Sequence, residues 1–427
     1  MGSAERIRNV AELISDAGRN IIVLSAMSGT TNSLAEIGAY LYSRNTEGAK
    51  DTISKLESKY RKHIEELYST GEYKAKATDY VNGTFRYIKS LSKKLFSQKE
   101  EKIILAQGEL ISTHLMHFLL LENGVNSALI PALDYMRTDA QGEPDGDFIK
   151  EHLQPLLEEN KNADLIITQG YICRNAQGDI DNLQRGGSDY SASLIGAAAG
   201  AKEIQIWTDI DGMHNNDPRI VEGTRAVRHL HFDEAAELGY FGAKILHPTC
   251  IQPAKFANIP VRLLNTMDPS APGTLINNVP EKGTIKAVAA KDNITAIKIK
   301  SSRMLLAYGF LRKVFEIFES WQTAIDMICT SEVEVSVTID NTGHLNEIIN
   351  DLKKYGTVST DAGMCIICVV GDMDWGNVGF EANAVEALKD IPVRMISYGG
   401  SSNNISFLVK ENDKERLLKA LSKCLFK

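Results

Sequence analysis

The sequence predicts an α/β fold with a mostly parallel sheet, followed by two smaller modules that mix strands and helices. In the first part of the chain, short and continuously apolar runs alternate with helical patterns and end in loops of small and polar residues. Beyond Pro280 the strand-like segments at 294–300 and 332–340 alternate apolar and polar residues instead. Continuous apolar runs are typical of strands covered on both faces, as in parallel sheets, whereas alternation indicates strands covered on one face.

Composition narrows the class of protein. The 427 residues are enough for two or three domains, and 24% of them are charged, with a net charge of −8. This balance gives no sign of a nucleic-acid partner. No apolar run is long enough for a membrane span and the N-terminus has no signal-peptide layout, so we expect a cytoplasmic protein that contacts neither nucleic acid nor membrane. The six scattered cysteines are typical of a reducing compartment, and we interpret Cys365 and Cys368 as core residues of a strand.

The elements of the first part follow from these patterns in chain order. We expect a helix over 4–17, buried strands at 21–24, 102–105, 163–168 and 204–207, and a mostly solvated helical excursion over 45–100. In parallel sheets ligands bind at the carboxyl ends of the strands, which is where the polar loops fall.

Pro272-Gly273, Asn277-Asn278 and Pro280 mark a boundary, after which a second pattern begins. In the first half of this pattern we expect strands at 294–300 and 332–340 and helices at 309–321 and 344–355. In the second half we expect strands at 365–370, 392–397 and 404–409 and helices at 377–388 and 413–425. We interpret this as a tandem βαββαβ repeat of roughly seventy residues each, which suggests paired regulatory modules.

The segment Arg185-Gly-Gly-Ser-Asp189 is the most specific functional signal. A guanidinium matches a carboxylate in two parallel hydrogen bonds, and glycines let the backbone approach a ligand closely. Ser188 or Asp189 capping the next helix is the plain alternative, but capping does not explain the preceding Arg-Gly-Gly. Asp189 is also suited to organise a nearby cation.

Two earlier segments are less specific. The loop Ser25–Asn32 presents hydroxyls and backbone N–H groups at a helix start, which suits an anion or a polar substrate but also describes an ordinary strand-to-helix turn. Glu109 precedes a predicted helix, where it would recognise an ammonium group or simply occupy the favourable first turn.

A second group of polar residues begins about twenty residues further on. Thr208-Asp209 ends a buried strand and Asp217-Pro-Arg219 closes the next turn, a combination that fits phosphate and metal handling. Lys244 would offset phosphoryl charge, although a solvated surface lysine is the commoner case. We interpret His247 as a structural histidine.

These segments, taken in order, resemble the aspartate kinases. The resemblance rests on Ser25–Asn32, Gly108-Glu109, Met136–Thr138, Arg185–Asp189, Trp207–Gly212, Asp217–Arg219, Phe241–Pro248 and Asn265-Thr266, and spans essentially the whole chain. Residues 304–311, 326–332, 394–401 and 403–405 resemble the two ACT domains of that family. Because the sequence ends after those domains, it resembles the monofunctional enzyme.

The resemblance implies a three-layer αβα amino-acid kinase domain over 1–283, followed by ferredoxin-like ACT domains over 291–360 and 361–427, with interleaving of the two left open. It implies transfer of the γ-phosphoryl group of ATP, with Mg²⁺, to the side-chain carboxylate of L-aspartate, giving 4-phospho-L-aspartate, the first step toward lysine, threonine and methionine. The nucleophile is already a carboxylate, so catalysis requires positioning and charge neutralisation rather than a strong base.

The same resemblance assigns roles to single residues. Arg185, Asp189 and Lys244 are the implied catalytic residues, with Arg185 clamping the substrate α-carboxylate, Glu109 contacting its amino group and Thr31 lining the same pocket. The implied nucleotide site contains Thr208, Asp209, His214, Asp217, Arg219, Lys244 and Ile245. The implied effector site contains Met304, Gly309, Phe310, Leu311, Asp326, Ser331 and Glu332, with Asp326 and Glu332 holding amino groups.

Departures from the family pattern leave some questions open. Lysine is the expected effector, but Leu306 and Ala307 are apolar where the lysine-sensitive pattern is polar, which leaves threonine open as the alternative. His214 replaces a usual Tyr, from which we expect altered nucleotide affinity. We also expect a homodimer formed through the ACT domains.

The family opens with a strand ending in Lys-Phe-Gly-Gly-Thr-Ser, and this sequence starts after that motif. We therefore expect the chain as printed to have little kinase activity and expect restoration of the segment to recover it. A catalytically dead, amino-acid-sensing ACT protein is the alternative, although retention of Arg185, Asp189 and Lys244 favours the kinase. Another amino-acid kinase, acting on glutamate or a nucleotide, is disfavoured because such enzymes lack tandem ACT domains.

Overall fold

The computed structural model of the chain describes residues 2–15, 18–92, 95–183, 186–242, 247–301 and 308–426. Six of the residues selected from the sequence lie outside the described residues: Arg185, Lys244, Ile245, Met304, Leu306 and Ala307. The chain divides into two compact units. The first consists of Met1–Ile206 and Thr249–Pro260, and the second of Trp207–Pro248 and Val261–Lys427.

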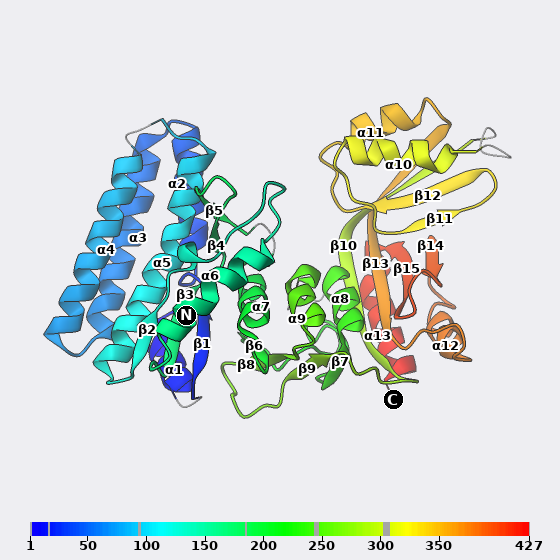
Figure 1. Cartoon of the computed structure of the whole chain (residues 1–427). Helices are drawn as coiled ribbons and strands as arrows, with labels where there is room; N and C mark the ends of the chain where they lie inside the picture. Colours follow the sequence, from blue (N-terminus) through cyan, green and yellow to red (C-terminus); the bar gives the residue numbers. More distant parts are fainter. Residues whose placement is uncertain are drawn as a thin grey trace. The chain divides into compact units, whose positions relative to one another are not determined.

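A three-stranded parallel sheet forms the centre of the first unit (Figure 1). Its order is β1 (Asn20–Leu24), β3 (Leu165–Gln169) and β2 (Ser127–Leu129). Every residue of β3 is buried, as expected of a strand covered on both faces. The strands predicted at 21–24 and 163–168, and their parallel pairing, are confirmed.

Helices cover both faces of this sheet. Leu165 and Ile167 pack into a core formed with α1 (Ala4–Ser15), α2 (Thr30–Tyr42), α3 (Thr46–Leu67), α4 (Gly71–Leu91) and α5 (Gln98–Glu122). Ile166, on the opposite face, packs with α6 (Gly146–Glu159) and α7 (Gly187–Ala199). The first unit is therefore the expected three-layer αβα arrangement.

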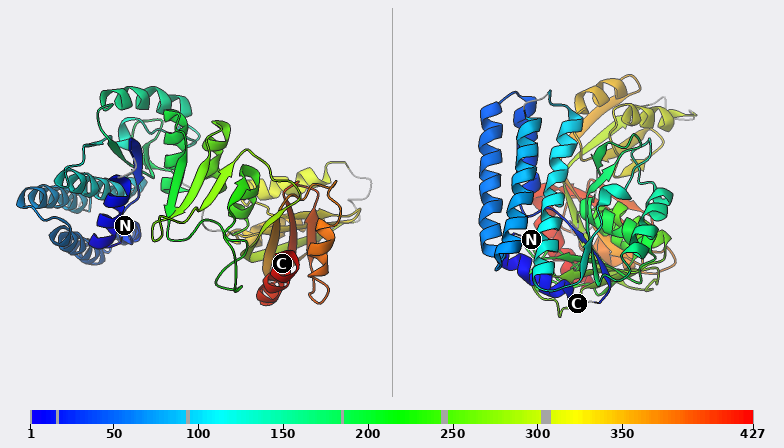
Figure 2. Two further views of the ribbon diagram at one scale, coloured as in Figure 1. Left: turned by 90° about the horizontal axis from the view of Figure 1, so that it is seen from below. Right: turned by 60° about the vertical axis from the view of Figure 1, so that its left-hand side comes forward.

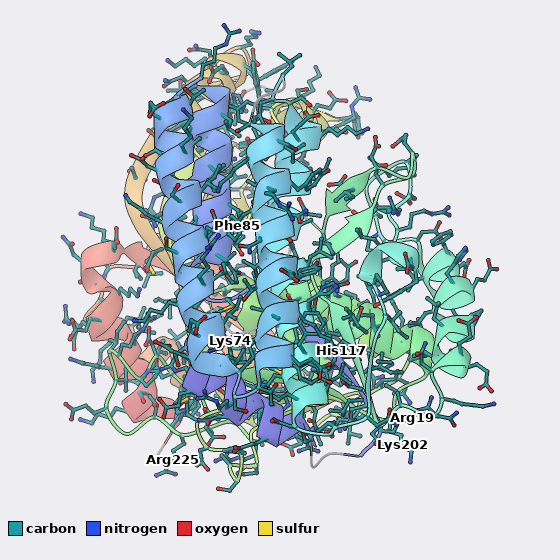
Figure 3. The ribbon with its side chains drawn as sticks, turned by 90° about the vertical axis from the view of Figure 1, so that its left-hand side faces the viewer. Arg19, Lys74, Phe85, His117, Lys202 and Arg225 are labelled. Carbon is teal, nitrogen blue, oxygen red and sulfur yellow. The ribbon has the colours of Figure 1, made fainter. Side chains whose placement is uncertain are left out.

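The first helical layer is largely built from the segment expected to be a solvated excursion. Its long helices run side by side in Figures 1 and 2, and Figure 3 looks onto them, with Lys74 and Phe85 marking α4 and His117 marking α5. The rings of Tyr60 and Phe85 lie 6.0 Å apart between α3 and α4, and both side chains are completely buried. The excursion is helical as predicted, but one side of it is an apolar core.

The predicted strand at 102–105 is wrong, because these residues belong to α5. A capping box starts this helix: Lys99 N–H donates to the Ser97 hydroxyl and the Glu100 carboxylate accepts from Ser97 N–H. Ile104, Ile111 and Leu115 then recur at helical spacing and are buried. Glu109 therefore lies well inside α5, which rules out a role in the first turn of a helix.

Helix α5 is also the one helix among the described residues that is long and apolar enough to cross a membrane. Its most apolar window has a mean hydropathy of 1.3, and 67% of that window is buried inside the structure. A core helix passes the same test, so this is weak evidence for a membrane span.

Smaller elements complete the first unit. They are η1 (Ala132–Asp134), the antiparallel pair β4 (Ile172–Arg174) and β5 (Ile180–Asn182), and α9 (Gln252–Phe256). Within the short 3₁₀ helix η2 (Pro248–Ile251), the chain passes from the second unit into the last segment of the first, which begins at Thr249.

The second unit begins with a small mixed sheet. Its order is β6 (Ile204–Thr208), β8 (Val261–Asn265), β9 (Thr274–Asn277) and β7 (His229–His231), with β7 parallel and β8 antiparallel to β9. Helix α8 (Phe232–Tyr240) follows β7 directly.

A six-stranded antiparallel sheet forms the rest of the second unit. Its order is β11 (Ile328–Thr330), β12 (Glu334–Ile339), β10 (Ile285–Lys300), β13 (Thr357–Gly371), β15 (Asn404–Lys410) and β14 (Met395–Tyr398). Helices α10 (Phe310–Ser320) and α11 (Leu345–Leu352) lie along one part of it, and α12 (Phe380–Glu386) and α13 (Lys414–Leu425) along the other (Figure 1). The short 3₁₀ helix η4 (Glu411–Asp413) precedes α13.

The two modules of this sheet are interleaved in the sequence. The first half of β10, Ile285–Lys291, pairs with the second half of β13, and its Val288 packs with Val369 and Leu417. The second half of β10 pairs with β12, and its Ile297 packs with Val337 in a separate core. The module that starts at 294 is thus inserted into the other one, whose closing strand comes before it in the sequence. Cys365 and Cys368 are completely buried in β13, as predicted.

Candidate active site

The first unit gathers polar groups where β1 and β3 end. Leu24 and Gln169 are paired at the last register position of these neighbouring strands, and Gly170 N–H donates to Leu24 O at 3.0 Å. The loop that begins at Ser25 and the turn at Gly170-Tyr171 therefore leave the same edge of the sheet. Such an edge is where parallel sheets bind ligands.

The first turn of α7 is packed against this edge. A Cβ atom added to Gly170 would lie 2.7 Å from Ser188 Cα, so only glycine permits this approach. Gly186 precedes the helix at φ 74°, and a Cβ atom there would lie 2.0 Å from Cys250 Sγ. The glycines of the Arg-Gly-Gly motif therefore let the backbone enter the helix at this place. The Ser25 hydroxyl donates to the Ser188 hydroxyl at 2.7 Å.

Glu109 reaches the same loop from α5. A Cβ atom on its neighbour Gly108 would lie 2.9 Å from Ala26 Cβ, so the helix packs tightly against the loop at this glycine. Ala26 N–H donates to Glu109 Oε1 at 3.3 Å, and Glu109 Oε2 is buried without a hydrogen-bond partner. Burial raises the pKa of Glu109 to about 7, since the residue is only 4% exposed. A buried carboxylate oxygen with no partner is suited to a cationic ligand group.

Asp189 and Tyr171 extend this group of residues. Asp189 lies in the first turn of α7, where burial raises the pKa of its carboxyl to about 6. Tyr171 has a left-handed backbone at φ 64°, and its N–H donates to Ser191 Oγ at 2.9 Å. Burial, with the nearby charge of Glu109, raises the pKa of Tyr171 to about 12. No role for Tyr171 was predicted from the sequence, although its position directly after Gln169-Gly170 at a strand end was a usable signal.

Helix α3 supports the start of α2. The buried Thr30 hydroxyl lies 2.9 Å from the Tyr60 hydroxyl, and Lys59 Nζ donates to Ser28 O at 2.6 Å. Thr31, the second residue of α2, is exposed at the loop. Lys59 and Tyr60 were not predicted, because nothing in the sequence links the helical excursion to this loop.

The residues predicted for a nucleotide lie in the second unit. Thr266 donates to Thr208 O through both its N–H and its hydroxyl, each at 2.8 Å, which fixes the end of β6. Asp209, the next residue, is exposed. His214 Nδ1 lies 3.0 Å from the Thr224 hydroxyl.

Arg219 and Asp217 form a two-pronged pair within one turn. Arg219 Nε and Nη2 donate to the two Asp217 carboxylate oxygens at 2.9 and 2.7 Å, and these hydrogen bonds lower the pKa of Asp217. The preceding residue, Asn216, is buried and donates through Nδ2 to Leu418 O in α13 at 3.1 Å. The turn is therefore fixed to the C-terminal helix, while Arg219 is largely exposed.

The residues predicted for an effector fall into two separate places. Gly309, at φ 80°, precedes α10, where Phe310 is buried and Leu311 is exposed, and Ser331 and Glu332 are exposed in the turn between β11 and β12. Asp326 is different, because its side chain is only 1% exposed and accepts hydrogen bonds from Tyr240 and Lys291. Among the described residues, no group of three His, Cys, Asp or Glu side chains could hold a metal ion.

Comparison with known proteins shows which family the sequence matches. The sequence matches the amino acid kinase family over residues 1–265 and an ACT domain family over 367–425. It is 34% identical to chloroplastic aspartokinase 1 of Arabidopsis thaliana over 448 residues, covering 100% of this chain and 78% of the relative. It is 32% identical to lysine-sensitive aspartokinase 3 of Escherichia coli over 441 residues, covering 98% of this chain and 95% of the relative.

Two solved structures are similar over the whole chain. E. coli aspartokinase III in complex with aspartate and ADP, in its R-state, has a TM-score of 0.86 at 29% identity and covers 100% of this chain and 97% of its own. The same enzyme with lysine and aspartate, in its T-state, has a TM-score of 0.81 at 32% identity, covering 99% and 96%.

Proposed function

Since the chain belongs to the aspartokinases, within the amino acid kinase family, we propose that it transfers the γ-phosphoryl group of ATP to the side-chain carboxylate of L-aspartate. The complex of the E. coli enzyme with aspartate and ADP supports both reactants. An aspartokinase acts in amino-acid biosynthesis, so the product would be 4-phospho-L-aspartate on the way to lysine, threonine and methionine.

Glu109 is the single observation that carries this proposal. Its Oε2 atom is buried, has no partner, and lies beside the loop at the end of β1. When ionised, this carboxylate pairs with the α-ammonium group of aspartate and thereby recovers the charge interaction that burial has removed. A substrate without an amino group would leave the carboxylate unpaired, so Glu109 selects an amino acid.

The other end of the substrate faces hydrogen-bond donors. The N-termini of α2 and α7 and the hydroxyls of Ser25 and Ser188 meet at the same edge of the sheet, and helix N-termini favour anionic groups. We propose that these groups, Thr31 and Arg185 position the two carboxylates of aspartate. Positioning is the main requirement, because the attacking carboxylate is already a nucleophile.

The reaction forms a bond between a carboxylate oxygen and the γ-phosphorus and breaks the bond from that phosphorus to ADP. We propose that Thr208, Asp209, His214, Asp217, Arg219, Lys244 and Ile245 bind the nucleotide, with Lys244 and Arg219 neutralising phosphate charge. Mg²⁺ is typically held by one or two carboxylates together with substrate phosphates. Asp189 is the carboxylate that suits it, because a cation would favour the ionised form that burial disfavours.

A hydroxylamine trap tests this function. ATP, Mg²⁺ and L-aspartate should give aspartyl hydroxamate at a rate that saturates with aspartate, whereas L-glutamate and N-acetyl-L-aspartate should not. Product formation that is independent of ATP, or equal with the three acids, would contradict the proposal. Aspartate binding by calorimetry without any turnover would favour an amino-acid-sensing protein instead.

We further propose that the ACT modules bind an amino acid as effector, with lysine as the expected ligand. The lysine complex of the E. coli enzyme supports this choice, and the start of α10 together with Ser331 and Glu332 is the proposed place. Inhibition and thermal shifts measured with lysine, with threonine and with both would decide between the two. A response to neither would contradict the proposal.

Two exposed apolar side chains on α10 support the proposed homodimer. Leu311 and Phe315 are 37% and 39% exposed and lie four residues apart, on one face of the helix, and Tyr308 just before it is fully exposed. A second copy of this chain would cover this face. Sedimentation equilibrium should show a dimer that Phe315→Asp weakens, whereas a monomer at all concentrations would contradict it.

A cytoplasmic location stays a prediction.

A further inference from the structure

We propose that Tyr240 is a positioning residue for nucleotide binding, which it supports by holding the end of α8 on the ACT sheet through Asp326 and Lys291. The inference rests on the proposed kinase function. It concerns residues of the second unit. Tyr240 and Asp326 are 86 residues apart, so no sequence motif contains both.

Tyr240 is the last residue of α8, and its side chain makes two contacts there. Its hydroxyl donates to Asp326 Oδ1 at 2.7 Å, and Lys291 Nζ lies 4.2 Å from the centre of its ring. Lys291 Nζ also donates to Asp326 Oδ1 at 2.6 Å and pairs with Asp340 Oδ2 at 2.9 Å. One tyrosine is therefore bound to a carboxylate through its hydroxyl and to an ammonium through its ring.

The Asp326–Lys291 pair at the centre of this cluster is largely shielded from water, so its bond is stronger than a surface contact, whereas Tyr240 is 40% exposed. The Asp326 side chain is 1% exposed and that of Lys291 is 17% exposed. Burial alone would lower the pKa of Lys291, but the hydrogen bonds to Asp326 and Asp340 outweigh it and raise this pKa. Lys291 therefore stays charged. Tyr240 and Lys291 both donate to Asp326 Oδ1, whereas Asp326 Oδ2 is buried without a hydrogen-bond partner. Removing one member of such a cluster is costly, because it leaves another buried group unpaired.

The backbone just beyond Tyr240 is held against the same strand. Gly242 has φ 112°, and a Cβ atom there would lie 2.0 Å from Ala290 O. Ala290 precedes Lys291 in β10, so Tyr240 and Gly242 contact consecutive residues of one strand. Two independent contacts thus fix the direction in which the chain leaves α8.

This direction affects the nucleotide site because two of its proposed residues come next in the sequence. Lys244 and Ile245 are four and five residues beyond Tyr240. A shift at Tyr240 would move them relative to the phosphates, and the charge of Lys244 acts only at short range. Glu109 lies in the first unit and makes none of the contacts described for Tyr240, so we expect aspartate recognition to be little affected.

Tyr240→Phe removes only the hydroxyl and is the primary test, with Tyr42→Phe as the matched control. Tyr42 also donates to a carboxylate, Glu101 Oε2 at 3.0 Å, and is similarly exposed at 49% against 40%. We expect Tyr240→Phe to raise the KM for ATP and the Kd for ADP by roughly three- to tenfold while the KM for aspartate changes less than about twofold. Tyr42→Phe should change none of them by more than about twofold.

Asp326 supplies a second pair of variants that separates the hydrogen bond from the packing. Asp326→Asn keeps an oxygen that can accept from Tyr240, whereas Asp326→Ala does not, so the alanine variant should weaken ADP binding more. Equal ADP affinity in wild type, Tyr240→Phe and Asp326→Ala would overturn the inference, even if thermal stability fell. A wild-type protein that binds no nucleotide would instead overturn the proposed function.

Discussion

The hydroxyl of Ser25 donates to the hydroxyl of Ser188 at 2.7 Å and joins the loop after β1 to the first turn of α7. The two residues are 163 positions apart, and they meet because β1 and β3 are parallel neighbours that end at the same register. Glu109 enters beside them from α5. The predictions for aspartate binding depend on how closely the loop after β1, the first turn of α7 and helix α5 approach each other.

Glycine at positions 108 and 170 permits that approach. Gly108→Ala would place Cβ 2.9 Å from Ala26 Cβ, and Gly170→Ala would place it 2.7 Å from Ser188 Cα. We expect each to weaken aspartate binding and to destabilise the fold by about 1–3 kcal/mol through overpacking. Gly83→Ala in α4 is the control, because a Cβ atom there meets nothing within 4 Å, and it should be neutral or stabilising by about 0.5–1 kcal/mol. Denaturant unfolding and calorimetry with aspartate would measure both effects.

Glu109 should make the protein less stable as pH rises. Its folded-state pKa of about 7 lies above the ordinary value of 4.5, so the folded state holds this proton more tightly than the unfolded state. The stability associated with it is complete below about pH 4.5 and is lost as pH rises through about 7. Glu109→Gln should therefore raise the melting temperature at pH 8 and leave it nearly unchanged at pH 4. Equal shifts at both pH values would show that burial does not perturb this carboxyl.

Aspartate binding should show the opposite dependence on pH. The ammonium of aspartate pairs with ionised Glu109, and below about pH 7 the free protein increasingly holds this carboxyl protonated. The Kd for aspartate should therefore rise as pH falls from 8 to 6, while in Glu109→Gln it should stay flat over that range. Calorimetry at several pH values separates the two proteins, and parallel profiles would assign the titration to another group.

Arg219 should matter for nucleotide binding and little for stability. It forms an ion pair with Asp217, but its side chain is 79% exposed, and such exposed pairs contribute little to the free energy of unfolding. Arg219→Ala should weaken ADP binding about tenfold or more if the guanidinium contacts phosphate. Lys62→Ala, which removes an exposed partner of Glu66, is the control for a lost surface ion pair. An unchanged Kd for ADP would remove Arg219 from the nucleotide site.

Local sequence patterns predicted those helices and strands in which all residues have the same kind of surroundings. The all-buried strand Leu165–Gln169 could be predicted from its apolar run. A helix after Arg185–Asp189 was also expected, but it starts at Gly187 with Gly186 as its N-cap, so Ser188 and Asp189 lie in its first turn and do not cap it. The run Lys102–Leu105 was misread, because Ser97 and Glu100 had already started a helix upstream. A short β-branched run is weak evidence for a strand when a capping box and the helical spacing of apolar residues indicate a helix.

Long-range partners were beyond sequence reasoning for a different reason. The βαββαβ repeat after Met364 lacks its last strand, and only the pairing of Ile285–Lys291 with β13 shows where that strand comes from. The contacts of Lys59 with Ser28 and of Tyr240 with Asp326 likewise depend on how separate elements pack. Glu109 was selected as a candidate from the sequence, but its distinguishing property, an unpartnered buried oxygen, is visible only in three dimensions.

Calorimetric titration of L-aspartate at pH 8 into the wild-type protein and Glu109→Gln tests the central claim most directly. We predict that aspartate binds the wild type, that Glu109→Gln binds it at least about tenfold more weakly, and that N-acetyl-L-aspartate binds neither. Equal affinity of the two proteins for aspartate, or tight binding of the N-acetylated acid by the wild type, would contradict this claim.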